Sequence, residues 1–374
     1  MKEAGHKDSA PSVSAGAPSA LQRLLALELA RAGGWLPFDR YMATVLYAPG
    51  LGYYANESRK FGAMPQSGSD FVTAPEMSPL FGATLAVAVA DALQATGTTE
   101  VWEFGAGSGA LAAQLLPALG DAAVRYTIIE LSASLRARQQ ERLAAWGDRV
   151  RWVDALPDAM AGVVVGNEVL DAMPVKLLAR AAGVWHERGV LLDGAGALAW
   201  SDRPTALRPP VEVPGDHDYL TEVHPQAQAF IRTLGDRLTQ GAAFFLDYGF
   251  PEAEYYHPQR HMGTLMCHHA HQADTDPLAL PGQKDITAHV DFTGIAVAAQ
   301  DVGLAVLGYT SQARFLLNGG IAERMAAADL PARAAALRLV NEHEMGELFK
   351  VLALHKGPFW DAPGFRAGDR THTL

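Results

Sequence analysis

The 374-residue sequence contains very little cysteine and no long apolar run. Its single cysteine, Cys267, cannot form an intrachain disulfide or a thiolate metal cluster, which is typical of a reducing compartment. The longest apolar stretch, residues 80–93, is too short to cross a bilayer and contains Asp91. We therefore expect no membrane insertion and predict a cytoplasmic location.

An excess of basic residues is also absent. Lys and Arg number 30 against 41 Asp and Glu, which gives a formal net charge of −11 at pH 7. This charge argues against nucleic acid as the main partner and would suit a basic substrate, although a mildly acidic pI is also ordinary for a soluble protein. Residues 1–18 contain no apolar signal region and are rich in Ala, Ser, Pro and Gly, so we expect a disordered leader.

Apolar strand patterns alternate with helix patterns through the middle of the chain. We predict strands at 100–104, 125–130, 150–153, 162–166 and 242–247, and helices at 108–118, 132–146 and 222–239. Extra strands are predicted at 176–181 and 184–192, and late strands at 304–310 and 347–354. Alternating strands and helices imply an α/β fold with a parallel sheet that has helices on both faces.

The remaining segments suggest a division of the chain. Ser19 is expected to cap a helix over 20–32, residues 35–66 read as an ordered loop region, and residues 76–95 look helical. We expect a leader at 1–18, an N-terminal extension at 19–95, a main domain at 96–356 with insertions at about 250–289 and 311–343, and a loose tail at 357–374.

Three glycines directly follow the first predicted strand, in VWEFGAGSGALA at 101–112. Gly105, Gly107 and Gly109 lie where parallel sheets bind ligands, at the carboxyl end of a strand. Taken alone they fit either a dinucleotide loop, G-x-G-x-x-A, or another nucleoside-containing cofactor. Glu130 ends the second strand, where a carboxylate accepts hydrogen bonds from ribose hydroxyls without choosing between these cofactors.

Glu103 discriminates between the two kinds of ligand. It lies inside the first apolar strand, two residues before Gly105. A buried carboxylate there would repel a pyrophosphate and attract a cation. S-adenosylmethionine carries a sulfonium and an ammonium group and no phosphate, so Glu103 favours that cofactor. The alternative is that Glu103 is an exposed residue on an edge strand.

Polar side chains follow two further strands. Asn167, Glu168 and Asp171 come after the fourth strand, and Asp247 and Tyr248 end the fifth. Polar groups that converge at strand ends cost stability unless they are paired, so together they indicate a site.

A histidine-rich stretch in the insertion suggests a metal site at first sight. The spacing of Cys267, His268, His269 and His271 matches no closed zinc set, so we expect no metal there and a loop that presents polar groups over the crevice instead. Neither a G-x-S-x-G nucleophile elbow nor a P-loop lysine occurs.

Several longer motifs resemble one family. The sequence is similar to the MidA family of class I S-adenosylmethionine-dependent methyltransferases, which includes a mitochondrial complex I assembly factor that acts as a protein arginine methyltransferase. The similar motifs span roughly residues 60–310 in the family's order: GSDFVTAPEMSPLFG, VWEFGAGSGALA, IIELSASL, GNEVLDAMPV, FFLDYG and GTLMCHHAHQADTDPLALPGQKDITAHVDF. One departure is FGAGSG, where the family reads closer to LGPGRG, and it keeps the glycine spacing.

The resemblance implies a Rossmann-like, seven-stranded, mostly parallel sheet with an antiparallel final strand, and an N-terminal extension that covers the cofactor crevice. It implies that the glycines line S-adenosylmethionine, that Glu130 holds the ribose and that Asp154 lies near the adenine. The extension would contribute Asp70, Thr73, Pro75 and Glu76 to the pocket. Asn167, Glu168 and Asp171 would face the methyl group and the acceptor.

The predicted activity is methyl transfer to a protein arginine, with Glu168 and Asp171 gripping the guanidinium and a link to respiratory complex assembly. Three alternatives stay open: a small-molecule methyltransferase, a non-catalytic assembly factor that binds S-adenosylmethionine, and a nicotinamide oxidoreductase. The sequence leaves the oligomeric state open between monomer and homodimer.

Overall fold

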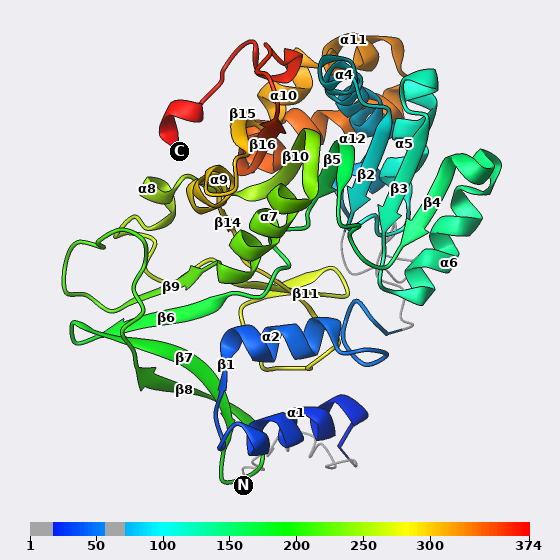
Figure 1. The fold of residues 1–374 in the computed structure, drawn as a ribbon. Coiled ribbons are helices and arrows are strands. Elements are labelled where there is room, and N and C mark those ends of the chain that lie inside the picture. Colours follow the sequence, from blue (N-terminus) through cyan, green and yellow to red (C-terminus); the bar gives the residue numbers. More distant parts are fainter. Residues whose placement is uncertain (1–17, 57–71) are drawn as a thin grey trace, which may run out of the picture.

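Seven strands form the central sheet of the computed structural model, which describes residues 18–56 and 72–374. Their order is β4-β3-β2-β5-β10-β16-β15, and only β16 runs antiparallel to both of its neighbours (Figure 1). The strands are β2 (Glu100–Phe104), β3 (Arg125–Ile129), β4 (Val150–Val153), β5 (Met160–Asn167), β10 (Leu238–Phe250), β15 (Ala305–Ser311) and β16 (Phe349–Lys356). A short strand, β14 (Val290–Asp291), pairs with the end of β10. The predicted mostly parallel sheet with an antiparallel final strand is confirmed.

Helices cover both faces of this sheet because its strands are apolar on both sides. On β10, the adjacent residues Phe244 and Phe245 are buried in opposite layers. One layer holds α4 (Pro79–Thr96), α5 (Ala110–Leu119), α10 (Gln312–Asn318), α11 (Ile321–Ala327) and α12 (Leu330–Val340). The other holds α7 (Pro225–Arg237) and α9 (Phe292–Gln300), while α6 (Ala133–Arg142) follows β3 at the cofactor edge.

The apolar run at 80–93 was expected to be too short to cross a bilayer, but helix α4, which contains it, extends over Pro79–Thr96 and is long and apolar enough by length and composition. It is the one such helix in residues 18–56 and 72–374. More than half of it is buried inside the protein. Packing accounts for the apolar character of α4, since Phe81, Leu85 and Val89 lie in the core between this helix and one face of the sheet.

A second, antiparallel sheet lies beside the central one. Its strands are β1 (Leu36–Pro37), β6 (Lys176–Ala181), β7 (Val184–Leu192), β8 (Leu198–Pro204) and β9 (Tyr219–Val223). The helices α1 (Ala20–Arg31) and α2 (Phe38–Tyr47) pack with it (Figure 1). The Ser19 cap is present as a full capping box with Gln22. Strands β8 and β9 were not predicted, and β9 replaces the start of the helix expected over 222–239.

Two expectations about segments outside the main sheet were wrong. Part of the predicted loop at 35–66 is helix α2, whose Phe38, Tyr41, Met42 and Val45 recur at helical spacing and are fully buried. The tail, expected to be loose, is packed: the Phe365 ring lies 5.5 Å from that of Phe315. Short turns of helix at Pro363–Phe365 and Thr371–Thr373 order it further. The predicted leader lies almost wholly outside the described residues.

The insertion at 250–289 folds back toward the sheet. It contains α8 (Glu252–Tyr255) and a three-stranded sheet of β11 (Met266–His269), β12 (Gln272–Asp274) and β13 (Asp285–Thr287). Figure 1 shows β11 and α2 beneath the central sheet. With α3 (Ala74–Met77), which precedes α4, these elements close the space at the carboxyl ends of the parallel strands.

Candidate active site

A cavity of about 1830 Å³ lies at the carboxyl ends of the parallel strands. Its walls come from the loop after β2, the ends of β3, β5 and β10, helices α2 and α6, and the sheet of β11 and β13. The sequence-predicted residues that line it are Thr73, Pro75, Glu76, Glu103, Gly105, Gly107, Glu130, Asn167, Glu168 and Asp171. Asp70 lies outside the described residues, and Asp154 is exposed and does not line the cavity.

The glycine loop requires glycine for its backbone conformation. Gly105, Gly107 and Gly109 have φ values of 63°, 53° and 80°, in the left-handed region that side chains disfavour. At Gly105 a Cβ would also lie 2.7 Å from Cγ2 of Val169. The loop therefore turns sharply from β2 into α5 and keeps its backbone on the cavity wall.

Glu103 is buried in the middle of the sheet. Its strand, β2, lies between β3 and β5, so the alternative of an exposed edge residue is wrong. The Tyr126 hydroxyl donates a 2.7 Å hydrogen bond to Oε2 of Glu103. Burial still raises the pKa of Glu103 to about 8, with the nearby Glu130 adding to the effect. The carboxyl therefore needs a cation beside it to be fully ionised near neutral pH.

Glu130 is held in place by a residue that sequence reasoning missed. Nε2 of Gln139 donates 2.9 Å hydrogen bonds both to Oε2 of Glu130 and to the Gly107 carbonyl oxygen. Gln139 is fully buried on α6, and its own Oε1 accepts from the Trp152 indole. Burial raises the pKa of Glu130. Gln139 thus joins the glycine loop to the end of β3.

The N-terminal extension is fastened to this loop by charged groups. Oε1 of Glu76 accepts a hydrogen bond from the Ser108 hydroxyl and pairs with Nη1 of Arg142 at 3.2 Å. Nε2 of Gln114 donates to the Pro75 carbonyl oxygen at 2.6 Å. Since Glu76 is engaged in these contacts, it positions α3 over the loop.

The turn after β5 carries the predicted acceptor residues. Glu168 has a φ of 54°, unusual for a residue with a side chain, and this turn is fixed by Asp247. Oδ2 of Asp247 accepts from the backbone N–H groups of Val169, Leu170 and Asp171 at 3.1, 2.9 and 3.3 Å. Asp247 is therefore a structural anchor beneath the site.

Glu168 and Asp171 are carboxyl groups that are shielded from solvent and lie near one another. Burial raises the pKa of Glu168 to about 8, and the charge of Asp171 adds to this. Burial raises the pKa of Asp171 to about 6, opposed by a hydrogen bond from Tyr248. Oδ1 of Asp171 and Oδ1 of Asn167 are buried without a hydrogen-bond partner. This arrangement is suited to a cationic, hydrogen-bond-donating ligand.

The insertion presents polar groups to the cavity, as the sequence led us to expect, but two residues of this wall, Asp285 and Tyr54, were not predicted. Asp285 on β13 is buried and accepts a 2.7 Å hydrogen bond from the Tyr54 hydroxyl, and the Tyr54 ring stacks on Tyr47. His268 lines the cavity, whereas Cys267 is buried in the core beneath. Within residues 18–56 and 72–374 no group of three or more His, Cys, Asp or Glu side chains could hold a metal ion.

These residues fit S-adenosylmethionine. The carboxyl of Glu130, beside the glycine loop, suits a ligand with ribose hydroxyls. The buried carboxyl of Glu103 suits a ligand that carries positive charge and no phosphate. With the sheet order and its antiparallel β16, they define a class I S-adenosylmethionine-dependent methyltransferase.

Comparisons with known proteins agree with this class. Residues 84–310 match the family described as "Putative S-adenosyl-L-methionine-dependent methyltransferase". A Burkholderia thailandensis crystal structure, described as a "likely methyl transferase" bound to S-adenosyl-homocysteine, is 53% identical with a TM-score of 0.91, covering 96% of this chain and 100% of that one. Protein arginine methyltransferase NDUFAF7 of Danio rerio is 28% identical, covering 86% of this chain and 84% of that protein. The Homo sapiens protein is also 28% identical, with coverage of 86% and 80%.

The chain belongs to this methyltransferase family, the MidA family. The predicted enzyme class and the cofactor, S-adenosylmethionine, are thereby confirmed.

The predicted cytoplasmic location was wrong. The curated relatives from Danio rerio, Caenorhabditis elegans and Homo sapiens are named as mitochondrial proteins. A single cysteine and an acidic pI are compatible with both the cytoplasm and the mitochondrion, so the composition does not distinguish between these two locations.

Proposed function

We propose that this methyltransferase acts on the guanidinium group of an arginine side chain in a protein. The observation that carries the proposal is the character of the acceptor wall, where Glu168, Asp171 and Asp285 surround a space flanked by tyrosines. Carboxylates and aromatic faces together recognise a planar, delocalised cation. The curated relatives from Danio rerio and Homo sapiens are named protein arginine methyltransferases, which supports the same acceptor.

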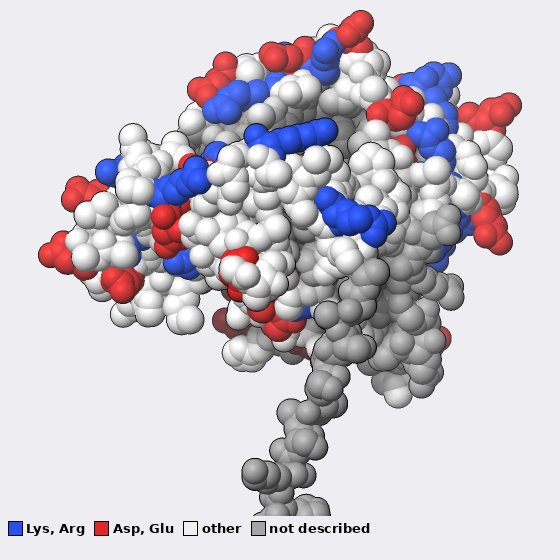
Figure 2. Space-filling model, turned by 90° about the horizontal axis from the view of Figure 1, so that it is seen from below, with Lys and Arg blue, Asp and Glu red and all other residues white. Residues whose placement is uncertain are grey.

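The surface also favours a protein over nucleic acid as the partner. On the face seen from below, Figure 2 shows Lys and Arg side chains interspersed with Asp and Glu, and the described residues in this view form no basic stripe. With a net charge of −11, such a surface gives little attraction for a phosphate backbone. The link to respiratory complex assembly stays a prediction.

On the cofactor side we propose separate tasks for the predicted residues. Gly105 and Gly107, which line the cavity, give the cofactor a close approach to the backbone, and Glu130 binds the ribose hydroxyls. Gly109 does not line the cavity and turns the chain into α5. Glu103 stabilises the positive charge of the cofactor. Thr73, Pro75 and Glu76 belong to the extension at 19–95, which with the insertion at about 250–289 covers the crevice. The support is that α2, α3 and β13 all contribute to the cavity wall.

The acceptor residues then act on the guanidinium. Bound S-adenosylmethionine supplies an electrophilic methyl group. Glu168 and Asp171 orient one guanidinium nitrogen toward it and hold the positive charge on the other nitrogens. Methylation of a guanidinium releases one proton. Glu168 lines the acceptor space, and the bound guanidinium stabilises its ionised form, so that the carboxylate accepts this proton. Asn167 donates a 2.9 Å hydrogen bond to Oε1 of Glu168 and fixes its orientation.

The test uses the full chain with methyl-labelled S-adenosylmethionine and a lysate of its own cell, and the labelled residue is located by mass spectrometry. We expect the label on arginine. The variants E168Q and D171N should bind S-adenosylhomocysteine within about threefold of the wild type and lose at least roughly 100-fold in transfer rate. Label on another residue type would overturn the acceptor, and loss of cofactor binding would overturn the assigned roles.

A further inference from the structure

The insertion presents alternate residues to the cavity. In the paired strands β11 and β13, Met266 lies opposite Thr287 and His268 lies opposite Asp285, and all four line the cavity. The residues between them, Cys267 and Ile286, face the core formed with α1 and α2. Strand alternation therefore turns Asp285 toward the active site.

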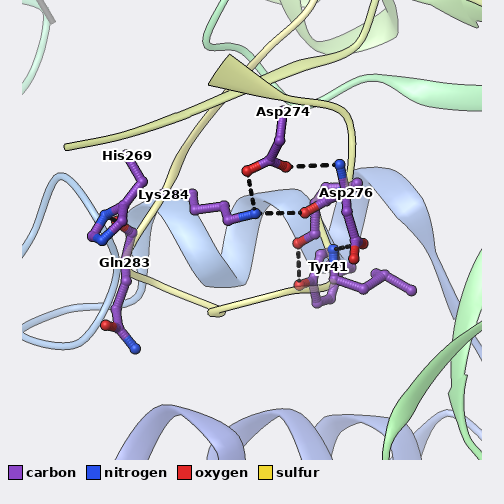
Figure 3. Close-up of polar contacts among 8 residues, drawn as sticks. Tyr41, His269, Asp274, Asp276, Gln283 and Lys284 are labelled. Atoms are coloured by element: carbon purple, nitrogen blue, oxygen red, sulfur yellow. Dashed lines mark hydrogen bonds and ion pairs between the residues drawn. The ribbon is translucent and has the colours of Figure 1, made fainter. Parts of the chain in front are cut away.

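The lysine next to Asp285 is directed elsewhere. Nζ of Lys284 pairs with Oδ2 of Asp274 at 2.6 Å and donates to the Asp276 carbonyl oxygen at 3.1 Å, as Figure 3 shows. His269 is likewise engaged with the Gln283 carbonyl oxygen, at 2.7 Å. The ammonium group of Lys284 is thus paired with Asp274 and does not line the cavity, whereas Asp285 does.

Contacts from the N-terminal extension hold Asp285 beside the other acceptor carboxyls. The Tyr54 hydroxyl donates to Oδ1 of Asp285, and the Tyr47 hydroxyl donates to the Ala172 carbonyl oxygen at 2.8 Å, next to Asp171. The Tyr47 and Tyr54 rings are stacked, with centroids 5.5 Å apart and planes 19° apart. The negative charge of Asp285 also raises the pKa of Glu168, so the two carboxyls share one space.

We propose that Asp285 binds the acceptor directly and selects a guanidinium over an ammonium group, with Tyr54 as its positioning residue. This inference rests on the proposed function. Three carboxylates on two walls can accept hydrogen bonds from several edges of a planar guanidinium, whereas an ammonium is a compact point charge that gains less from the tyrosine faces. Asp285 thus determines which acceptor binds and takes no part in the methyl transfer itself.

The experiment measures binding of two probes, ethylguanidinium and n-butylammonium, to the full chain saturated with S-adenosylhomocysteine. We expect the wild type to prefer ethylguanidinium, D285N to lose roughly tenfold or more in affinity for it, and Y54F to lose less. The charge-matched control is D158N, because Asp158 has a fully exposed side chain paired with Arg237 on the surface. Asparagine at 285 keeps an acceptor for the Tyr54 hydroxyl, and the melting temperature with S-adenosylhomocysteine checks that each variant is folded.

Two results would overturn the inference: ethylguanidinium binding to D285N that equals the wild type, or a wild type that does not discriminate between the probes. The proposed function fails separately, if the lysate label is found on a residue other than arginine. Preference for ethylguanidinium that D285N abolishes and D158N retains supports Asp285 as the selective residue.

Discussion

Replacing Glu103 by glutamine separates charge from shape at the cofactor site. Glu103 is 1% exposed on the central strand β2 and has a hydrogen-bond partner in Tyr126. Glutamine keeps the size of the side chain and an oxygen to accept the Tyr126 hydroxyl. Because burial raises the pKa of Glu103 to about 8, the wild-type carboxyl is mostly neutral at pH 7 without cofactor, and E103Q should fold with nearly unchanged stability.

The expected change in cofactor affinity follows from the raised pKa of Glu103. A cationic ligand that binds beside Glu103 stabilises its ionised form, so binding releases a proton. Below pH 8 each pH unit then costs about 1.4 kcal/mol of binding free energy, which is tenfold in Kd. The affinity for S-adenosylmethionine therefore rises with pH. A charge-assisted contact contributes about 1.5 to 3 kcal/mol, so the wild-type advantage over E103Q should be small at pH 6 and grow toward pH 8.

Calorimetric titration with S-adenosylmethionine at pH 6 and pH 7 measures the effect. We expect the wild-type Kd to fall by up to about tenfold over this interval. The Kd of E103Q should fall clearly less, because only the other carboxyls of the cavity, such as Glu130 and Glu168, still titrate. The control is E100Q on the same strand, because Glu100 pairs with Arg151 at 2.7 Å and does not line the cavity. A pH dependence that is the same in wild type and E103Q would refute the role of Glu103.

Two further variants test the scaffold of the site. D247N should lower the free energy of unfolding by about 2 to 4 kcal/mol in urea titrations, because its Oδ2 accepts three backbone N–H groups of the turn after β5; an unchanged midpoint would contradict this. G105A should destabilise the protein by at least about 1 to 2 kcal/mol, because φ is 63° and the new Cβ would strike Val169. Its melting temperature should also lose most of the rise that S-adenosylhomocysteine gives the wild type, and a full rise would speak against a strained loop.

The central sheet could be predicted from the sequence because its parallel strands contain apolar runs, and β2 and β3 are each followed directly by a helix, α5 and α6. The predicted strand at 100–104 coincides with β2, and the one at 150–153 with β4. Helix α2 could not be found in this way. Its apolar stripe lies close to a turn-rich stretch, and its burial depends on contacts with β6, β7 and β13, which are distant in the sequence.

The residues of the candidate site also fall into two groups, those that could be predicted from the sequence and those that could not. Residues at the carboxyl ends of strands, such as Glu103 and Glu168, were predictable because the ends of parallel strands meet at one edge. Gln139 and Asp285 were not, since neither follows a strand of the central sheet. Gln139 acts from the middle of a helix, and Asp285 reaches the cavity through a hairpin and a contact with Tyr54, 231 positions away in the chain.

The raised pKa values of Glu103 and Glu168 have a common physical origin that bears on both ligands. The two carboxyls line one cavity, and Asp171 and Asp285 add negative charge around Glu168. Such a cavity binds anions poorly, which argues against the pyrophosphate of a dinucleotide on electrostatic grounds that the glycines alone do not provide. In the proposed function, the cavity also lessens the repulsion between two cationic ligands, cofactor and acceptor, because each has carboxylates of its own. The glycine loop therefore shapes the site, and the carboxyl groups around it determine which ligands the site can hold together.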